Sequence, residues 1–568
     1  MRTYNNLKPV DPPKPIVNFK EMLRENAELF GEKAIYIYKD NGEMQEKSYI
    51  QFHEDIINFS TMLYESGLAG KRIAVTGDTH PAWMTAFFAT IITGGVIVPL
   101  DRELDADQMA DFMKVAECSA VVYTAALTEK VEGAAAKLPF IEKFIPVGKS
   151  TFEDNRLLPF DTMLEEGARL IKNGDTRYSE QDTDLERMVA ILFTSGTTGT
   201  SKGVMLSYKN FIACSNACCQ STQYSKDDVF VSVLPIHHTY ELSTVQLSGP
   251  NLGATIVICE GVRYATRYFK EYKPTALVLV PLFLETIHKK IWSEIKRKGL
   301  EKKVKTAIKV SNSLLKTGVD IREKMFSDVT SVFGGNLKSI VAGGAPLDPQ
   351  IVRDFYSFGI TVLQGYGITE CSPLVSVNRP GKVSFTSVGQ AVEGVEVKIE
   401  QIPDSTGEEG EILVRGENVM MGYYDNKEAT DAVITEDGWF RTGDIGTIDK
   451  KGYIYITGRL KNVIIASNGK NIYPEELEEH LYRLSTVKEC VVIGRDTEDG
   501  VCITAVIVPD YEIVGEGTTD TALSCILKEE IAQINRSLPS YKHINRFEIR
   551  HEDFEKTLTK KIKRFLVK

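Results

Sequence analysis

The sequence lacks the features of a nucleic-acid-binding or disulfide-linked protein. Its 67 lysine and arginine residues are outnumbered by 78 aspartate and glutamate residues, which gives a net charge of −11. Binding to nucleic acid without sequence preference requires clustered basic side chains, so we expect no nucleic-acid partner. The nine cysteines are an odd number without a Cys-x-x-Cys pair. They indicate a reduced, cytoplasmic protein.

The sequence also lacks a secretory signal and an uninterrupted membrane span. The first twenty residues carry scattered charges and four prolines, with no apolar core. Residues 83–100 contain no charge, but Gly94-Gly95 divides them into an expected helix over 83–93 and an expected strand over 96–100. A spanning helix needs about 20 apolar residues in one run. We therefore expect a soluble protein.

Short apolar runs separated by helical stretches dominate the sequence before Gly389. They lie at 72–77, 120–123, 189–193, 229–234, 254–259, 276–280 and 339–342. Such runs are typical of strands buried on both faces, so the sequence predicts an α/β fold with mostly parallel sheets. Ligands of these folds bind at the carboxyl ends of the strands. The loops that follow the runs are therefore the expected sites of chemistry.

Beyond Gly389 the pattern changes twice. Segments 395–400, 411–416 and 453–456 are short and separated by glycine turns, which predicts a small antiparallel sheet or barrel. After Lys461 a helix is expected to begin at Pro474, because four glutamates follow in its first turns. Strands at 489–494, 502–509 and 546–550 come next. We therefore expect a large domain over residues 1–460 and a small α+β domain over residues 461–568.

A loop rich in glycine and hydroxyl groups follows the predicted strand at 189–193. Glycines allow backbone N–H groups to face an anion, hydroxyl groups donate further hydrogen bonds, and a lysine adds positive charge. The loop lacks the Walker spacing of Gly-Lys-Ser/Thr after four spacer residues. A polyphosphate is the expected ligand, since a flexible linker would not directly follow a buried strand. The candidate residues are Thr194, Ser195, Gly196, Thr197, Thr198, Gly199 and Lys202.

A second loop, at 364–370, offers three complementary groups. Tyr366 has a flat stacking face, Thr369 can donate to a phosphate or carboxylate oxygen, and Glu370 can hold a hard cation. Asp444 lies on a Thr-Gly-Asp turn, where a carboxylate either binds a ribose or caps the turn. Both interpretations of Asp444 stay open on the residues alone.

Two adjacent histidines, His237 and His238, follow the predicted strand at 229–234. No Cys or His partner stands at metal-ligand spacing from them, so we do not expect a zinc site. From the residues alone, a hydrogen-bonded packing histidine remains an alternative to a functional one.

Together these segments resemble the adenylate-forming enzymes, which comprise acyl-CoA synthetases, luciferases and the adenylation domains of peptide synthetases. The resemblance covers nearly the whole chain and is greatest to the long-chain fatty acid–CoA ligases. It implies stacked sheets in a large ATP- and acyl-binding domain and a small mobile C-terminal domain. The implied nucleotide contacts are Gly343, Gly344 and Ala345 beside the adenine, Tyr366 against it with Gly365 and Gly367 in the same nucleotide loop, Thr369 on the phosphate, Glu370 on Mg²⁺, Asp444 on the ribose and Arg459 near ribose and phosphate.

The resemblance also implies residues for the acyl group and for the thiol. Alignment on Leu234-Pro235 favours His238 over His237 as the gate for the acyl carboxylate. Lys561 takes the position of the lysine that reaches the reacting carboxylate and phosphate. Lys560 is the alternative, because it stands where much of the family has glycine. The remaining implied residues are Lys461 as hinge and Gly469, Lys470 and Asn471 along the coenzyme A tunnel.

The implied reaction uses ATP, Mg²⁺ and coenzyme A to convert a fatty acid to acyl-AMP and then to acyl-CoA, with release of pyrophosphate and AMP. Transfer to the phosphopantetheine of an acyl carrier protein remains the alternative. The lysine-rich segment 285–336 and Tyr240-Glu241 resemble the long-chain branch, although 285–336 also fits a plain pair of surface helices. The basic tail at 556–564 leaves open a peripheral contact with the inner face of the membrane.

Overall fold

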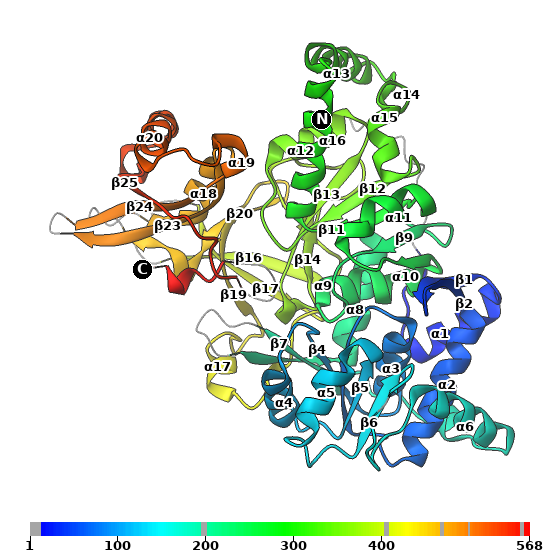
Figure 1. Ribbon diagram of the computed structural model, residues 1–568. Helices are drawn as coiled ribbons and strands as arrows, with labels where there is room; N and C mark the ends of the chain where they lie inside the picture. Colours follow the sequence, from blue (N-terminus) through cyan, green and yellow to red (C-terminus); the bar gives the residue numbers. More distant parts are fainter. Residues whose placement is uncertain are drawn as a thin grey trace. The chain divides into compact units, whose positions relative to one another are not determined.

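The computed structural model describes residues 13–150, 152–194, 201–402, 408–465, 471–497, 500–556 and 562–567, and it contains two compact units (Figure 1). Unit 1 holds the described residues within Met1–Thr194, Ser201–Glu396 and Arg415–Ala432. Unit 2 holds those within Val397–Val414 and Val433–Lys568. Each unit buries its own apolar side chains. The division expected at Lys461 stays a prediction.

A nine-stranded sheet forms one half of unit 1, and its central strands are parallel. The antiparallel strands lie toward the two edges. In sheet order the strands are β15 (Gln390–Ala391), β14 (Leu374–Val377), β13 (Thr361–Gly367), β12 (Ser339–Ala342), β11 (Ala276–Leu279), β9 (Val229–Ser232), β10 (Thr255–Ile258), β1 (Ala34–Asp40) and β2 (Glu43–Ser48). Strands β9 to β12 coincide with apolar runs in the sequence, because consecutive residues, which point to opposite faces of the sheet, are nearly all buried.

A seven-stranded sheet forms the other half of unit 1. Four neighbouring pairs from β7 to β6 are parallel, and β8 and β18 add antiparallel strands at one edge. In sheet order the strands are β18 (Gly422–Tyr423), β8 (Lys202–Ser207), β7 (Met188–Thr194), β4 (Val96–Leu100), β3 (Arg72–Thr76), β5 (Ala120–Thr124) and β6 (Lys143–Val147). The predicted α/β class with mostly parallel sheets is confirmed.

The helices of unit 1 begin where the sequence supplies caps. Capping boxes start α2, α4 and α8, at Ser48, Asp105 and Ser207, and each satisfies backbone N–H groups of the first turn. The helices are α1 (Phe19–Phe30), α2 (Tyr49–Glu65), α3 (Pro81–Ile92), α4 (Ala106–Val115), α5 (Thr128–Ala135), α6 (Phe160–Lys172), α7 (Arg177–Glu180), α8 (Tyr208–Ser221), α9 (Thr239–Glu241), α10 (Ser248–Leu252), α11 (Ala265–Tyr272), α12 (Pro281–Arg297), α13 (Glu301–Lys316), α14 (Arg322–Met325), α15 (Ser327–Thr330), α16 (Pro349–Ser357) and α17 (Lys427–Asp431).

The uncharged run at 83–100 belongs to the core of unit 1. Every residue of α3 is buried, and the parallel strand β4 follows it, as the sequence predicts. Full burial explains the missing charges, since a helix enclosed by protein on all sides needs no polar face. Within the described part of the chain, no helix combines the length and apolar character needed to cross a membrane.

Unit 2 contains a four-stranded sheet with antiparallel pairing, a two-stranded ribbon and a three-stranded sheet. The four strands, in sheet order, are β16 (Val395–Gln401), β17 (Gly410–Gly416), β19 (Phe440–Ile448) and β20 (Ile454–Arg459). The remaining elements are β21 (Ile464–Ile465), β22 (Asn471–Ile472), α18 (Pro474–Tyr482), β23 (Val487–Thr497), β24 (Gly500–Pro509), α19 (Tyr511–Val514), α20 (Asp520–Ser537) and β25 (Arg546–Ile549). The helix predicted to begin at Pro474 is confirmed as α18.

Candidate functional site

Three of the predicted loops in unit 1 leave from one edge of the nine-stranded sheet. Strands β9, β11, β12 and β13 are parallel neighbours, with Val341 opposite Val278 on one side and Leu363 on the other. Their carboxyl ends therefore lie along one edge. The loop with His237 and His238 follows β9, residues 343–345 follow β12, and residues 368–370 follow β13. The sheet thus gathers segments that are far apart in the sequence.

Tyr240 ties these strand ends together. Its hydroxyl group donates to the carbonyl oxygens of Leu279 at 3.2 Å and Val341 at 3.3 Å, at the ends of β11 and β12. A Cβ atom on Gly343 would lie 3.3 Å from both the Tyr240 hydroxyl oxygen and the Gly365 carbonyl oxygen. That spacing is tighter than an ordinary contact, so glycine at 343 permits this close approach.

Lys202 and Glu370 meet at a residue that the sequence analysis missed. The hydroxyl group of Tyr423 donates to Glu370 Oε1 at 2.9 Å, and Lys202 Nζ lies 4.5 Å from the centre of the Tyr423 ring. Burial and the nearby Glu370 carboxylate raise the pKa of Tyr423 well above its ordinary value, so it stays a hydrogen-bond donor. The arrangement brings an ammonium group over the Tyr423 ring and a carboxylate to the hydroxyl group of the same residue.

Strand pairing explains how Lys202 reaches this position. Thr194 is opposite Lys202 in the antiparallel β7–β8 pair, and its hydroxyl group donates to the Lys202 carbonyl oxygen at 3.4 Å. Tyr423 lies in β18, which pairs with β8 so that Tyr423 faces Val204. The other phosphate-loop candidates, Ser195, Gly196, Thr197, Thr198 and Gly199, lie outside the described residues.

The surroundings of Glu370 fit a cation that is bound mainly by phosphate and water. Within the residues that the structure describes, no group of three or more His, Cys, Asp or Glu side chains could hold a metal ion. Mg²⁺ is commonly bound by one or two carboxylates together with substrate phosphates. Glu370 and Thr369, both half-buried in the 3₁₀ turn Thr369–Cys371, therefore fit a magnesium–nucleotide complex. Tyr366 is buried, with 8% of its surface exposed.

The histidine loop contacts a carboxylate from another sheet that the sequence analysis also missed. Asp101 Oδ2 lies 3.4 Å from Nε2 of His237, and the two side chains are 9% and 10% exposed. The rings of His237 and His238 are 4.0 Å apart between centroids, at an angle of 52°. Asp101 directly follows β4, and a polar residue at the end of a parallel strand was the available signal.

A buried carboxyl group closes the same loop. Glu241 is fully buried and accepts hydrogen bonds from the Ser232 hydroxyl group at 2.5 Å and Gln246 Nε2 at 3.1 Å. Burial raises the pKa of Glu241 to about 7, against the opposing effect of these hydrogen bonds. Gln246 belongs to the π-helical turn Leu242–Leu247. Hydrogen bonds of a π-turn join residues five positions apart, and Gln246 stands five positions after Glu241 and contacts it.

In unit 2, Asp444 and Arg459 form a pair across two strands. They face each other in the β19–β20 register, with Arg459 Nε 2.9 Å from Asp444 Oδ1. Asp444 is buried and Arg459 is 45% exposed. The Asp444 N–H group donates to Thr442 Oγ1 at 3.0 Å, and Gly443 takes a φ of 70°, which favours glycine. The structure thus brings together two residues that the family resemblance assigns to one nucleotide.

The remaining predicted residues of unit 2 are only partly described. Lys461 is exposed in the 3₁₀ turn Leu460–Asn462, beside an Asn462 amide that donates to Glu475 Oε1 at 2.5 Å. For Asn471, the structure describes only the backbone, in β22. Gly469, Lys470, Lys560 and Lys561 lie outside the described residues.

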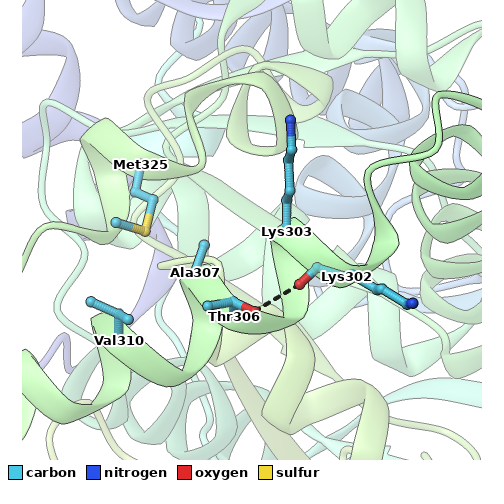
Figure 2. Close-up of a pocket in the computed structure, with 6 residues that line it drawn as sticks. All are labelled: Lys302, Lys303, Thr306, Ala307, Val310 and Met325. Atoms are coloured by element: carbon cyan, nitrogen blue, oxygen red, sulfur yellow. Dashed lines mark hydrogen bonds between the residues drawn. The ribbon is translucent and has the colours of Figure 1, made fainter.

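A groove of about 460 Å³ lies away from these residues, on α13 and α14 (Figure 2). The Thr306 hydroxyl group donates to the Lys302 carbonyl oxygen at 2.9 Å. Figure 2 shows the Lys302 and Lys303 ammonium groups directed away from the apolar side chains. The charged groups therefore do not face the apolar side chains that line the groove. It is lined by Lys302, Lys303, Thr306, Ala307, Val310 and Met325.

Comparisons with known proteins identify a family and several relatives. The model of the AMP-binding enzyme family matches residues 23–424, and the model of the AMP-binding enzyme C-terminal domain matches residues 461–567. The chain is 26% identical over 588 residues to the chloroplastic long-chain-fatty-acid–acyl-carrier-protein ligase AEE15 of Arabidopsis thaliana, covering 90% of this chain and 79% of the relative. It is 26% identical over 539 residues to the long-chain-fatty-acid–CoA ligase FadD15 of Mycobacterium bovis, covering 88% and 86%.

The fold is also similar to solved structures. ATP-bound MatB from Rhodopseudomonas palustris superposes with a TM-score of 0.74 at 23% identity, covering 96% of this chain and 98% of that chain. At this identity the likeness concerns the fold alone. It matches the large, mostly parallel unit and the smaller C-terminal part expected from the sequence.

Proposed function

Because this chain belongs to the AMP-binding enzyme family, we propose that it activates a long-chain fatty acid with ATP and transfers the acyl group to coenzyme A. In the first step a carboxylate oxygen of the acid bonds to the α-phosphorus of ATP, and pyrophosphate leaves. In the second step the thiolate sulfur bonds to the acyl carbonyl carbon, and AMP leaves. Negative charge gathers on phosphate oxygens in the first step, so positioned positive groups are the main catalytic requirement.

The contact of Lys202 and Glu370 with Tyr423 is the observation that best supports the proposal. Lys202 would offset charge on the leaving pyrophosphate. Glu370 would hold Mg²⁺ together with phosphate oxygens, and the bound ion would add positive charge there. Tyr423 keeps the ammonium group and the carboxylate apart, because its ring contacts Lys202 and its hydroxyl group binds Glu370. Direct pairing of the two charges would make both less available to the nucleotide.

In the proposed complex the other residues orient the reactants. Asp444 would accept hydrogen bonds from the ribose hydroxyl groups, with Arg459 holding the carboxylate in place. His238 would contact the acyl carboxylate at the strand edge. Lys561 would approach the reacting carboxylate and phosphate, and rotation about Lys461 would replace it by the thiol tunnel between the two steps. These roles are inferred from the family resemblance and from the distances above.

Long-chain acids are the proposed substrates, because two relatives named above are described as long-chain-fatty-acid ligases. The segment 285–336, which resembles the long-chain branch, contains most of α12 and all of α13. The second candidate acceptor is the phosphopantetheine of an acyl carrier protein, since the Arabidopsis relative is named for that acceptor. The chemistry of both steps is unchanged by this choice, as each acceptor presents a thiol.

Two cations of the basic tail are paired with glutamates and would therefore not take part in a membrane contact. The Lys556 ammonium group binds Glu489, and the Arg564 guanidinium group binds Glu478. Both glutamates are largely buried. These contacts favour a structural role for Lys556 and Arg564 over a solvated charge run at an anionic surface.

Product analysis tests the proposal directly. The protein is incubated with Mg-ATP, coenzyme A and a panel of carboxylic acids from acetate to oleate. We expect AMP, pyrophosphate and a thioester whose yield peaks with the long acids. Acid-dependent pyrophosphate without acyl-CoA would favour a carrier-protein acceptor. If neither AMP nor pyrophosphate forms with any acid, the proposed activity is wrong.

A further inference from the structure

Asp101 and His237 join the two sheets of unit 1 at the strand edge that carries the site. Asp101 follows β4 in the seven-stranded sheet, and His237 follows β9 in the nine-stranded sheet. Both side chains are about nine-tenths buried. A buried carboxylate costs free energy unless another group compensates its charge. Its position against a histidine therefore needs an explanation beyond chance packing.

The two oxygens of Asp101 have different partners. Oδ1 accepts a hydrogen bond from the Glu103 N–H group at 2.9 Å, and Oδ2 lies 3.4 Å from His237 Nε2. Burial alone would raise the pKa of Asp101. The contact with His237 and the Glu103 N–H group outweigh burial and lower the pKa below its ordinary value. Asp101 is therefore an ionised carboxylate with one oxygen fixed by its own turn and the other directed at the imidazole.

His237 in turn packs against His238. Their ring centroids are 4.0 Å apart, so rotation of either ring would displace the other. The backbone of His238 is fixed as well, since its N–H group donates to the Pro235 carbonyl oxygen at 3.2 Å and its carbonyl oxygen accepts from Leu242 N at 2.9 Å. The His237 ring limits the side-chain torsions of His238.

We propose that Asp101 and His237 are positioning residues for His238, with Asp101 orienting the His237 ring and that ring holding His238 toward the acyl carboxylate. The inference rests on the proposed role of His238 in binding the acid. An ionised Asp101 beside Nε2 of His237 favours a proton on that nitrogen, and with it one tautomer and one ring orientation. The 3.4 Å distance is long for a hydrogen bond, and such contacts shorten when substrate completes a site.

The test combines two substitutions in a double-mutant cycle. Asp101→Asn, His237→Phe and the double variant are assayed by acid-dependent exchange of pyrophosphate into ATP, with acid and ATP varied separately. We expect Asp101→Asn to lower kcat/KM for the acid about tenfold, because small misplacements of a binding group are costly. KM for ATP should stay within about twofold of the parent value. In the His237→Phe background, Asp101→Asn should have no further effect.

Controls separate positioning from folding. Asp107→Asn is the matched variant, because Asp107 lies on the exposed side of α4 in an ion pair with Lys137. It should leave all kinetic constants unchanged. Thermal unfolding and ATP binding of each variant report whether the sheets still assemble. A role of Asp101 in stability alone would lower the unfolding temperature without changing kcat/KM for the acid in the folded fraction.

Three outcomes would overturn the inference. They are an unchanged kcat/KM for the acid in Asp101→Asn, an equal increase in KM for ATP and acid, and effects of the two substitutions that simply add. Failure of the proposed function looks different. In that case the parent protein itself would show no acid-dependent exchange with any acid, and the assigned role of the pair would fall with it.

Discussion

Two buried glutamates, Glu241 in unit 1 and Glu478 in unit 2, show opposite ways to hold a carboxyl group near a segment with a proposed active-site residue. Burial raises the pKa of each to about 7. Glu241 is bonded to neutral groups, the Ser232 hydroxyl and the Gln246 amide. Glu478 accepts from the Val492 N–H group at 2.6 Å and binds the guanidinium group of Arg564.

The difference follows from what each carboxyl group anchors. Glu241 ends the loop with His237 and His238, which leaves β9 and stays within the core of unit 1. Glu478 lies in α18 and holds Arg564, three residues beyond Lys561 in the sequence. The hydrogen bonds between Glu241 and its neutral partners tolerate protonation of the carboxyl group. The ion pair between Glu478 and Arg564 weakens as soon as the Glu478 carboxylate is protonated. Unit 1 thus fixes its loop independently of charge, and unit 2 fixes its tail through charge.

The largest expected effect tests the lysine on the tail. Lys561→Ala should lower acid-dependent pyrophosphate exchange by about 100-fold or more, because it removes a positive charge from the reacting phosphate. Thioester formation from supplied acyl-AMP and coenzyme A should change by less than about threefold, since that step does not need this charge. Both rates are measured on the same preparation.

Lys560→Ala is the matched control for this prediction. If pyrophosphate exchange is lost in Lys560→Ala and kept in Lys561→Ala, the catalytic lysine is Lys560 and not Lys561. Equal loss of both half-reactions in Lys561→Ala would contradict the proposed change of active segments between the steps.

The second effect is on the pH dependence of stability. Each glutamate has a folded-state pKa of about 7 against an ordinary 4.5. The folded protein therefore binds the proton more tightly, so the contribution of each group is greatest below about pH 4.5 and is lost as pH rises to about 7. Glu241→Gln has no titrating group at this position, so its stability does not fall over this pH range. Its free energy of unfolding should therefore exceed that of the parent by an amount that grows to about 3 kcal/mol as the pH rises from about 4.5 to about 7.

The free energy of unfolding should increase less in Glu478→Gln, because this substitution leaves the Arg564 guanidinium group without its carboxylate. Urea unfolding between about pH 5 and pH 8, followed by hydrogen exchange of peptides from α9 and α18, measures the two sites separately. The same pH-dependent gain for both variants would remove the distinction between a neutral network and a charge pair.

The third largest effect is expected for Arg564→Ala, which removes the ion pair between the tail and Glu478. We expect the free energy of unfolding of unit 2 to fall by about 2 kcal/mol, since the buried carboxyl group of Glu478 loses its cation but can take up a proton. Pyrophosphate exchange should fall about tenfold, with thioester formation from acyl-AMP unchanged, because a loosened segment positions its lysine poorly. Lys563→Ala serves as control, as Lys563 lies 3.7 Å from the exposed Glu555. Equal effects of both substitutions would mean that the Glu478 contact has no special role.

The parts of the fold that follow from local pattern were predictable. Apolar runs marked β3, β5, β7, β9, β11 and β12, and Pro474 with its glutamates marked the start of α18. Strand ends in turn located the loops with His238, Gly343 and Glu370. These features depend on hydrophobic period and capping, which are properties of short segments.

The contacts between distant segments were not predictable in this way. Tyr423 and Glu370 are 53 residues apart and meet through a strand of two residues, too short to leave a periodic pattern. Asp101 meets His237 because two separate sheets end at the same place. Arg564 meets Glu478 across 86 residues. Each of these contacts depends on which distant segments become neighbours in the fold, and a single sequence does not contain that information locally.

The smallest expected effect concerns the neutral anchors of unit 1. Tyr240→Phe removes the hydroxyl group that donates to the Leu279 and Val341 carbonyl oxygens, at a cost of about 1 kcal/mol. A Cβ on Gly343 would also lie 3.3 Å from that hydroxyl oxygen, so Gly343→Ala should be less harmful in the Phe background than in the parent. Unfolding free energies of the two single variants and the double variant measure the coupling. Strictly additive losses would show that Tyr240 and Gly343 do not share a contact, and would leave Glu241 as the anchor of this loop.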